Sequence, residues 1–196
     1  MKKLVTAGIV ASTLLLTNAS ADTKWYAGVE VGSASNTTEL ELERYGISAS
    51  VDVDNNYKDI KFVVGKGTGD DWYTQLYLSK ITYDKGHWFS KDDKALEIGF
   101  ETMKQFKVHE KVYPFLKFGL GIANMDTNQT KIVDSLISAV SLTLGAGVDF
   151  KVTENISILG GLDYNYKSWQ DAEDGTDTIS TSDSGTRFYV GANYRF

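Results

Sequence analysis

Apolar and polar residues alternate with a period of two along eight runs of the chain, as in β-strands that have one apolar face. In the clearest run, Val140, Leu142 and Leu144 alternate with small or polar residues. The runs cover residues of about 24–34, 57–66, 72–82, 95–105, 112–123, 139–151, 156–167 and 186–196. Each is close to the roughly 9–11 residues that a tilted strand needs to cross a bilayer.

Short and long connections alternate strictly between these runs. The short ones are residues 67–71, 106–111 and 152–155, whereas the long ones are about 35–56, 83–94, 124–138 and 168–185. Membrane barrels have tight turns at one end and longer loops at the other. The pattern therefore predicts an all-β fold, an eight-stranded antiparallel up-and-down transmembrane barrel with both termini at the end of the short turns.

Two of the long connections contain further signals. In 35–56, the alternations Glu39–Glu43 and Ile47–Val53 predict strands that continue beyond the lipid. The connection 168–185 is rich in Ser, Thr and Gly, and we expect it to be a solvated loop. Its acidic residues are Asp171, Glu173, Asp174, Asp177 and Asp183.

Periodicity does not say which face points inward, because a soluble barrel places its apolar face inside. Glycines and isolated charges share the polar face, as a narrow polar lumen requires, and aromatic residues mark the ends of the apolar face. Together with the unequal loops, this favours the inverted arrangement, with the apolar face towards lipid. The predicted aromatic girdle is Trp25, Trp72, Phe150, Tyr164, Tyr166 and Phe196.

Seven charged residues are predicted to line the lumen: Glu30, Lys61, Glu97, Glu101, Lys117, Asp163 and Arg195. Charges removed from water must pair, because an unpaired buried charge is costly. A hairpin centred near residues 108–109 places Glu101 diagonally opposite Lys117, and we expect these two side chains to meet. The network holds the barrel closed in one interpretation and gates a small ion channel in the other.

The amino terminus has the pattern of a secretory signal. Lys2 and Lys3 precede an apolar run at 4–16, and small residues at 19–21 form a cleavage pattern. The run is too short for a spanning helix, which needs about 20 apolar residues. We therefore expect residues 1–21 to be a cleaved signal peptide and residues 22–196 to be one domain.

Composition and charge exclude several classes of function. The chain has a formal charge of −6 and no cysteine; without residues 1–21 it keeps 18 basic and 26 acidic residues, a charge of −8. No basic stripe for nucleic acid exists, and disulfides and thiolate metal sites are impossible. Asp52–Asn56 begins like a calcium loop, but Tyr57 replaces the turn glycine and Val63 the closing glutamate. We expect no metal and no cofactor.

The closing strand, Phe188–Phe196, ends on an aromatic residue and completes a pattern that starts at Trp25. This pattern resembles the small outer-membrane β-barrel families, the OmpA-type transmembrane domain and its OmpX-like relatives, over residues 22–196. The resemblance implies a bacterial outer-membrane location with periplasmic termini, contact with outer-membrane lipid and lipopolysaccharide, and a monomer. It also implies that Tyr194 and Phe196 belong to the signal for the barrel-insertion machinery. Nothing follows Phe196, so the peptidoglycan-binding domain of OmpA proteins is not expected.

Three functions remain open at this stage. The leading hypothesis is a non-enzymatic barrel that presents four external loops for envelope integrity or surface contact. The second is a small porin-like channel. The third is a lipid A-modifying enzyme, which rests only on His87 and Ser90 in an external loop. Asn128 fits a short bacterial glycosylation sequon in another external loop.

Overall fold

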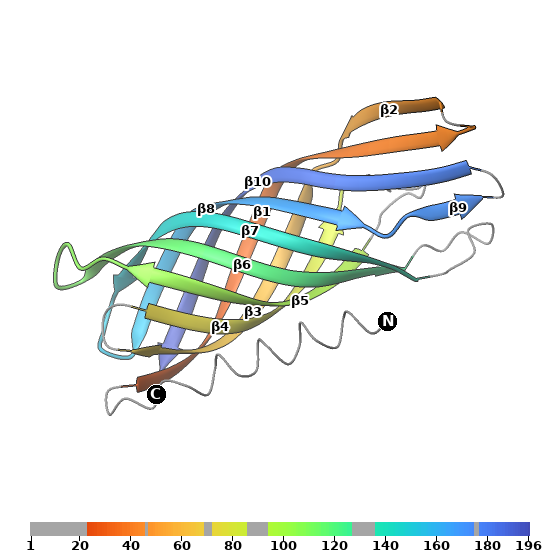
Figure 1. Cartoon of the computed structure of the whole chain (residues 1–196). Helices are drawn as coiled ribbons and strands as arrows, with labels where there is room; N and C mark the ends of the chain where they lie inside the picture. Colours follow the sequence, from red (N-terminus) through yellow and green to blue (C-terminus); the bar gives the residue numbers. More distant parts are fainter. Residues whose placement is uncertain (1–22, 46, 69–71, 86–93, 127–135, 175–176) are drawn as a thin grey trace.

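The computed structural model describes residues 23–45, 47–68, 72–85, 94–126, 136–174 and 177–196, and these form one antiparallel sheet (Figure 1). Its strands are β1 (Thr23–Arg44), β2 (Ile47–Asp54), β3 (Tyr57–Thr68), β4 (Trp72–Tyr83), β5 (Lys94–Gln105), β6 (Val112–Asp126), β7 (Leu136–Lys151), β8 (Ile156–Trp169), β9 (Ala172–Asp174) and β10 (Asp177–Arg195). Within these ranges, no helix is long and apolar enough to cross a membrane.

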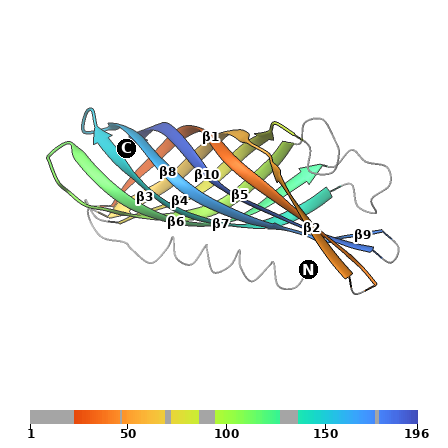
Figure 2. The same cartoon turned by 90° about the horizontal axis from the view of Figure 1, so that it is seen from above.

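The sheet closes into a barrel because β10 pairs with β1 (Figure 2). In the described part of the chain the wall consists of eight strands, β1, β3 to β8 and β10, which confirms the predicted eight-stranded antiparallel barrel. Following paired residues around the wall from Gly28 leads back to β1 at Thr38, ten residues further along. With a rise of about 3.3 Å per residue and a strand spacing of about 4.8 Å, this shift tilts the strands by about 40°.

The two faces of the wall have the predicted inverted polarity. Along β7, Val140, Leu144 and Val148 are exposed on the outside, while Ser141 and Thr143 are buried inside. The other wall strands repeat this arrangement. A protein that must face lipid exposes its apolar face, and the interior then holds the polar side chains.

This polarity reverses near one end of the barrel. On β1 the outward positions change from Val29 and Val31 to Glu39 and Glu41, whereas the inward positions become apolar at Leu40. Lipid favours apolar side chains on the outside, and water favours polar ones. The reversal therefore marks the limit of lipid contact on this strand.

Beyond that limit the strands continue as a second structure, here named the protruding sheet. It consists of β2, the end of β1, the start of β10 and β9, and it lies at the opposite end of the barrel from the carboxy terminus (Figure 1). The pairing of β1 with β2 extends from Thr37–Asp54 to Arg44–Ile47. The predicted strands within 35–56 are thus present.

The predicted loop at 168–185 is wrong for most of its length. Strand β10 begins at Asp177 rather than near residue 186, and Ser182 pairs with Ser168 of β8. The segment resembled a loop because its outward face is made of Ser and Thr rather than apolar residues. A strand that faces water on the outside loses the alternation that identifies a lipid-facing strand.

Several predicted features lie outside the described residues. These are the signal peptide at 1–21, the His87 and Ser90 pair, and the sequon at Asn128.

Candidate functional site

The barrel interior contains most of the buried charge. Seven acidic and five basic side chains are buried at inward-facing positions of the described strands: Glu30, Asp59, Glu97, Glu101, Asp149, Asp163, Asp183, Lys61, Lys117, Lys167, Arg187 and Arg195. An isolated charge in such an interior would cost several kcal/mol, so pairing is required.

Six of these side chains form a closed ring of alternating charge, here named the ion-pair ring. Its members come from six strands and are, in order, Arg187, Glu30, Lys61, Glu101, Lys117 and Asp163. The nitrogen–oxygen distances around the ring are 3.1, 4.0, 2.7, 3.8, 2.8 and 3.1 Å. Each charge therefore has two neighbours of opposite sign, and the links Lys61–Glu101 and Lys117–Asp163 join strands that do not pair with each other.

Five ring members are among the seven lumen residues named from the sequence. The structure places Glu101 and Lys117 3.8 Å apart, as the hairpin register predicted. Glu101 also accepts a hydrogen bond from Gln75, whose own amide oxygen accepts one from Tyr26 at 2.8 Å.

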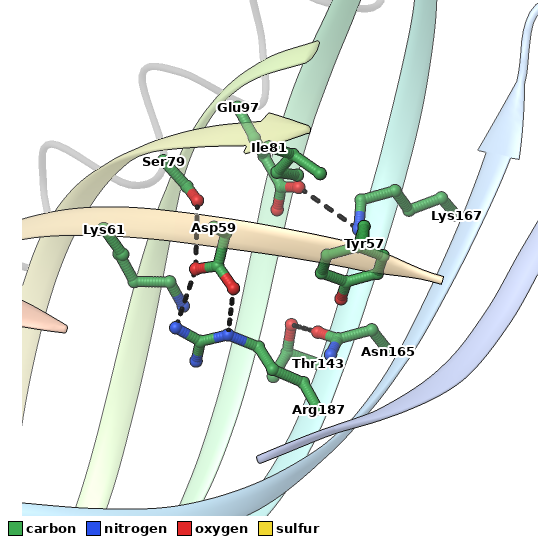
Figure 3. A pocket seen from close by; sticks show the side chains of 10 residues that line it. All are labelled: Tyr57, Asp59, Lys61, Ser79, Ile81, Glu97, Thr143, Asn165, Lys167 and Arg187. Carbon is green, nitrogen blue, oxygen red and sulfur yellow. Dashed lines mark hydrogen bonds and ion pairs between the residues drawn. The ribbon is translucent and has the colours of Figure 1, made fainter. Parts of the chain in front are cut away.

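Arg187 is the centre of the network and was not among the predicted lumen residues. Its Nε and Nη2 donate to the two carboxylate oxygens of Asp59, both at 2.8 Å, a bidentate pair (Figure 3). Its Nη1 donates to Glu30 and Asp163, both at 3.1 Å. Arg187 and Asp59 share the inward parity of Arg195 and Lys61 on their strands, so periodicity could have identified both.

The other two predicted lumen residues belong to separate clusters. Glu97 accepts hydrogen bonds from Tyr77 at 2.6 Å and Ser141 at 2.7 Å, and it pairs with Lys167 at 3.4 Å. Near the short turns, Arg195 pairs with Asp149 at 2.6 Å. Lys167 and Asp149 were also missed, because each lies near the end of a predicted run.

The prediction that Asp183 is a solvated loop residue is wrong. Its side chain is buried and accepts hydrogen bonds from Thr38 at 2.6 Å, Tyr83 at 3.0 Å and Trp169 at 2.9 Å. The reason is the continuation of β10, which turns Asp183 into an inward-facing position of the wall.

Apolar clusters pack on both sides of the ion-pair ring. The cluster towards the protruding sheet contains Ala34, Tyr57, Ile81, Tyr83, Ala95, Ala123, Met125, Ile137, Ala139 and Trp169. The cluster towards the short turns contains Tyr26, Val63, Tyr73, Tyr77, Met103, Phe115, Leu159 and Tyr189. A small cavity beside Arg187 and Lys167 measures about 10 Å³, against the roughly 10–15 Å³ that one water molecule needs (Figure 3). At this place the interior is therefore packed closely, with room for about one water molecule.

The predicted girdle residues all lie on the outer wall and are exposed. Four of them, Trp25, Trp72, Phe150 and Phe196, lie near the end of the barrel that carries both the short turns and the carboxy terminus. Tyr164 and Tyr166 lie on β8, in the half nearer the protruding sheet. The rings of Tyr194 and Phe196 stack with centroids 6.4 Å apart.

The described residues contain no group of three His, Cys, Asp or Glu side chains that could hold a metal ion. His109 lies in the turn between β5 and β6, where it is exposed.

The comparisons with known proteins identify the same architecture. Residues 4–196 match a family model described as the outer membrane protein beta-barrel domain. No curated protein matches the chain.

Many solved structures are similar, and three of them show the extent of the likeness. OprG from Pseudomonas aeruginosa has a TM-score of 0.60 and 11% identity, with 90% of this chain and 96% of that chain covered. Neisserial surface protein A has a TM-score of 0.56 and 19% identity, with 88% and 97% covered. AlkL, solved in lipid bilayers, has a TM-score of 0.54 and 13% identity, with 92% and 93% covered. At these identities the likeness shows the fold alone.

Proposed function

The chain belongs to the outer-membrane β-barrel family, and from this we propose that it is a closed, non-enzymatic barrel that presents its protruding sheet outside the cell. The membership implies a bacterial outer-membrane location. In our proposal the mature domain is residues 22–196, its termini and short turns face the periplasm, and Tyr194 and Phe196 serve insertion.

The observation that supports a structural rather than a conducting role is the ion-pair ring between two apolar clusters. The ion-pair ring lies within the lumen, and its six side chains come from six different strands of the wall. An eight-stranded barrel leaves just enough interior for side chains to fill. A wall that is held together from inside suits a scaffold for external structure.

The protruding sheet supplies the surface for contact. All but one residue of β2 are exposed, and within the described residues β2 pairs only with β1. Its other edge therefore carries unpaired backbone N–H and C=O groups, which can add a strand from a partner protein. Acidic and serine side chains, such as Glu39, Ser50 and Asp52, occupy the outward face of this sheet, and charged side chains on an edge strand oppose aggregation.

Cysteine labelling tests the proposed orientation directly, because the chain has no cysteine. Ser50→Cys places a thiol on exposed β2, and Lys111→Cys places one in the exposed β5–β6 turn. A membrane-impermeant maleimide is expected to label Ser50→Cys on intact cells and Lys111→Cys only after permeabilisation. The reverse pattern, in variants whose gel mobility is still heat-modifiable, would show that the protruding sheet faces the periplasm.

A further inference from the structure

Three lysines, here named the basic patch, lie together on the outer wall at the end that carries the protruding sheet. Lys58 on β3 pairs with Thr82 on β4, and Thr82 pairs with Lys94 on β5. Lys80 precedes Thr82 by two residues and so shares its outward face. With a strand spacing of about 4.8 Å, the Cα atoms of Lys58 and Lys94 lie about 10 Å apart.

Each lysine is the first polar residue beyond the lipid-facing rows of its own strand. Lys58 lies next to Ile60 on that face of β3, and Lys80 and Lys94 have the same relation to Leu78 and Leu96. The residues at this position on the other five wall strands are uncharged: Ser33, Asn124, Ser138, Ser168 and Thr186. The basic patch is therefore confined to one side of the barrel.

The three ammonium groups are available for a ligand. All three side chains are exposed, and in the described ranges no ion pair includes them. Beyond Thr82 on the same face, the next residue is exposed Asp84, which follows the end of β4. Lysine stems can lie along an apolar surface while the ammonium reaches the polar boundary.

We propose that the basic patch binds the phosphate groups of lipid A, the membrane anchor of lipopolysaccharide. This rests on the proposed orientation, which places the basic patch in the outer leaflet. Lipid A carries its phosphates on the sugar backbone at the head of its acyl chains. Three cations around the Thr82 hydroxyl match such a group, while Ile60, Leu78 and Leu96 lie below, where acyl chains pack. The three positive charges of the basic patch contrast with the net charge of −6 of the whole chain.

Binding of defined lipids tests the proposal. Protein refolded from inclusion bodies into detergent, and hence free of lipopolysaccharide, is titrated with bisphosphorylated lipid A and with chemically dephosphorylated lipid A. Lys58→Gln, Lys80→Gln and Lys94→Gln are combined in one variant. The matched control combines Lys24→Gln, Lys107→Gln and Lys111→Gln, which removes the same charge at the other end of the barrel.

We expect the patch variant to bind bisphosphorylated lipid A at least about tenfold more weakly than wild type, and the control variant to bind it normally. Dephosphorylated lipid A is expected to bind wild type as weakly as intact lipid A binds the patch variant. If both triple variants bind bisphosphorylated lipid A with equal affinity, the proposal is overturned. It is also overturned if wild type binds phosphatidylglycerol or inorganic phosphate as tightly as it binds bisphosphorylated lipid A. Heat-modifiable mobility confirms that each variant is folded. The thiol labelling tests the proposed orientation by itself. A wrong orientation is therefore distinguishable from a basic patch that does not bind lipid A.

Discussion

At the scale of single residues, Arg187 decides how the interior is held together. One guanidinium contacts three carboxylates from three other strands, those of Asp59, Glu30 and Asp163. Its planar fork suits the bidentate contact with Asp59, which a lysine ammonium cannot reproduce. Removing this group leaves three buried carboxylates with too little positive charge.

The variant Arg187→Met is therefore expected to lower the free energy of unfolding by about 3–5 kcal/mol, the usual cost of breaking a buried ion pair. Urea titration in detergent micelles, followed by tryptophan fluorescence, measures it. Arg187→Lys keeps the charge and should lose less, and adding Asp59→Asn to Arg187→Met should recover part of the loss. Wild-type stability of Arg187→Met would mean that the ion-pair ring contributes nothing.

At the scale of elements, the inward face of the wall depends on close packing between neighbouring strands. Gly99 of β5 pairs with both Tyr77 of β4 and Gly121 of β6, so these three residues share one row. A Cβ atom at Gly99 would lie 2.5 Å from the Tyr77 hydroxyl oxygen, and one at Gly121 would lie 2.6 Å from Ser141 Oγ. The ring of Tyr77 thus occupies the space that the two missing side chains leave, and its hydroxyl donates to Glu97.

Gly121→Val is expected to displace Tyr77 and to destabilise the barrel by about 1–3 kcal/mol, the usual cost of overpacking. The same urea titration reports it. Leu120→Val changes the neighbouring, lipid-facing position of β6 and serves as the control, with little expected loss. A Gly121→Val barrel as stable as the control would show that the interior has room that the structure does not indicate.

Strand β10 shows how far an element can be predicted from its residues. Its part from Phe188 onwards is apparent from the sequence, because Phe188, Val190 and Tyr194 face lipid and alternate with polar residues. Its earlier part has Ser182 and Ser184 on the outward face and pairs with β1 and β8 all the same. Backbone pairing with existing neighbours extends the strand where side-chain patterning alone gives no signal.

At the scale of the whole molecule, apolar and charged layers of side chains follow one another along the axis of the barrel. Each charge of the ion-pair ring lies beside charges of opposite sign, and an apolar cluster lies on each side of the ring. Ions would have to cross both apolar layers and displace paired charges, at a large cost in desolvation.

Wild-type protein in planar bilayers is therefore expected to show no discrete channel openings. Incorporation into the bilayer is verified by recovering folded, heat-modifiable protein from it. Discrete openings that disappear on Lys117→Glu would contradict a closed scaffold, since they would identify the ion-pair ring as a gate.

The sequence by itself determined the lipid-facing part of each wall strand, which of its faces meets lipid, and the even strand count that returns the start of β1 and the end of β10 to one side. These are local properties, because the two-residue period of a strand and the polarity of the medium that each face contacts act on each strand separately. The tertiary structure alone decided which charges meet between strands that are not neighbours in the chain. Pairing of β10 with β1 brings Arg187 of β10 against Asp59 of β3, two strands away across Gly32 of β1, and the continuation of β10 turns Asp183 inward. Such contacts depend on strand tilt and closure, properties of the complete sheet that no single strand encodes.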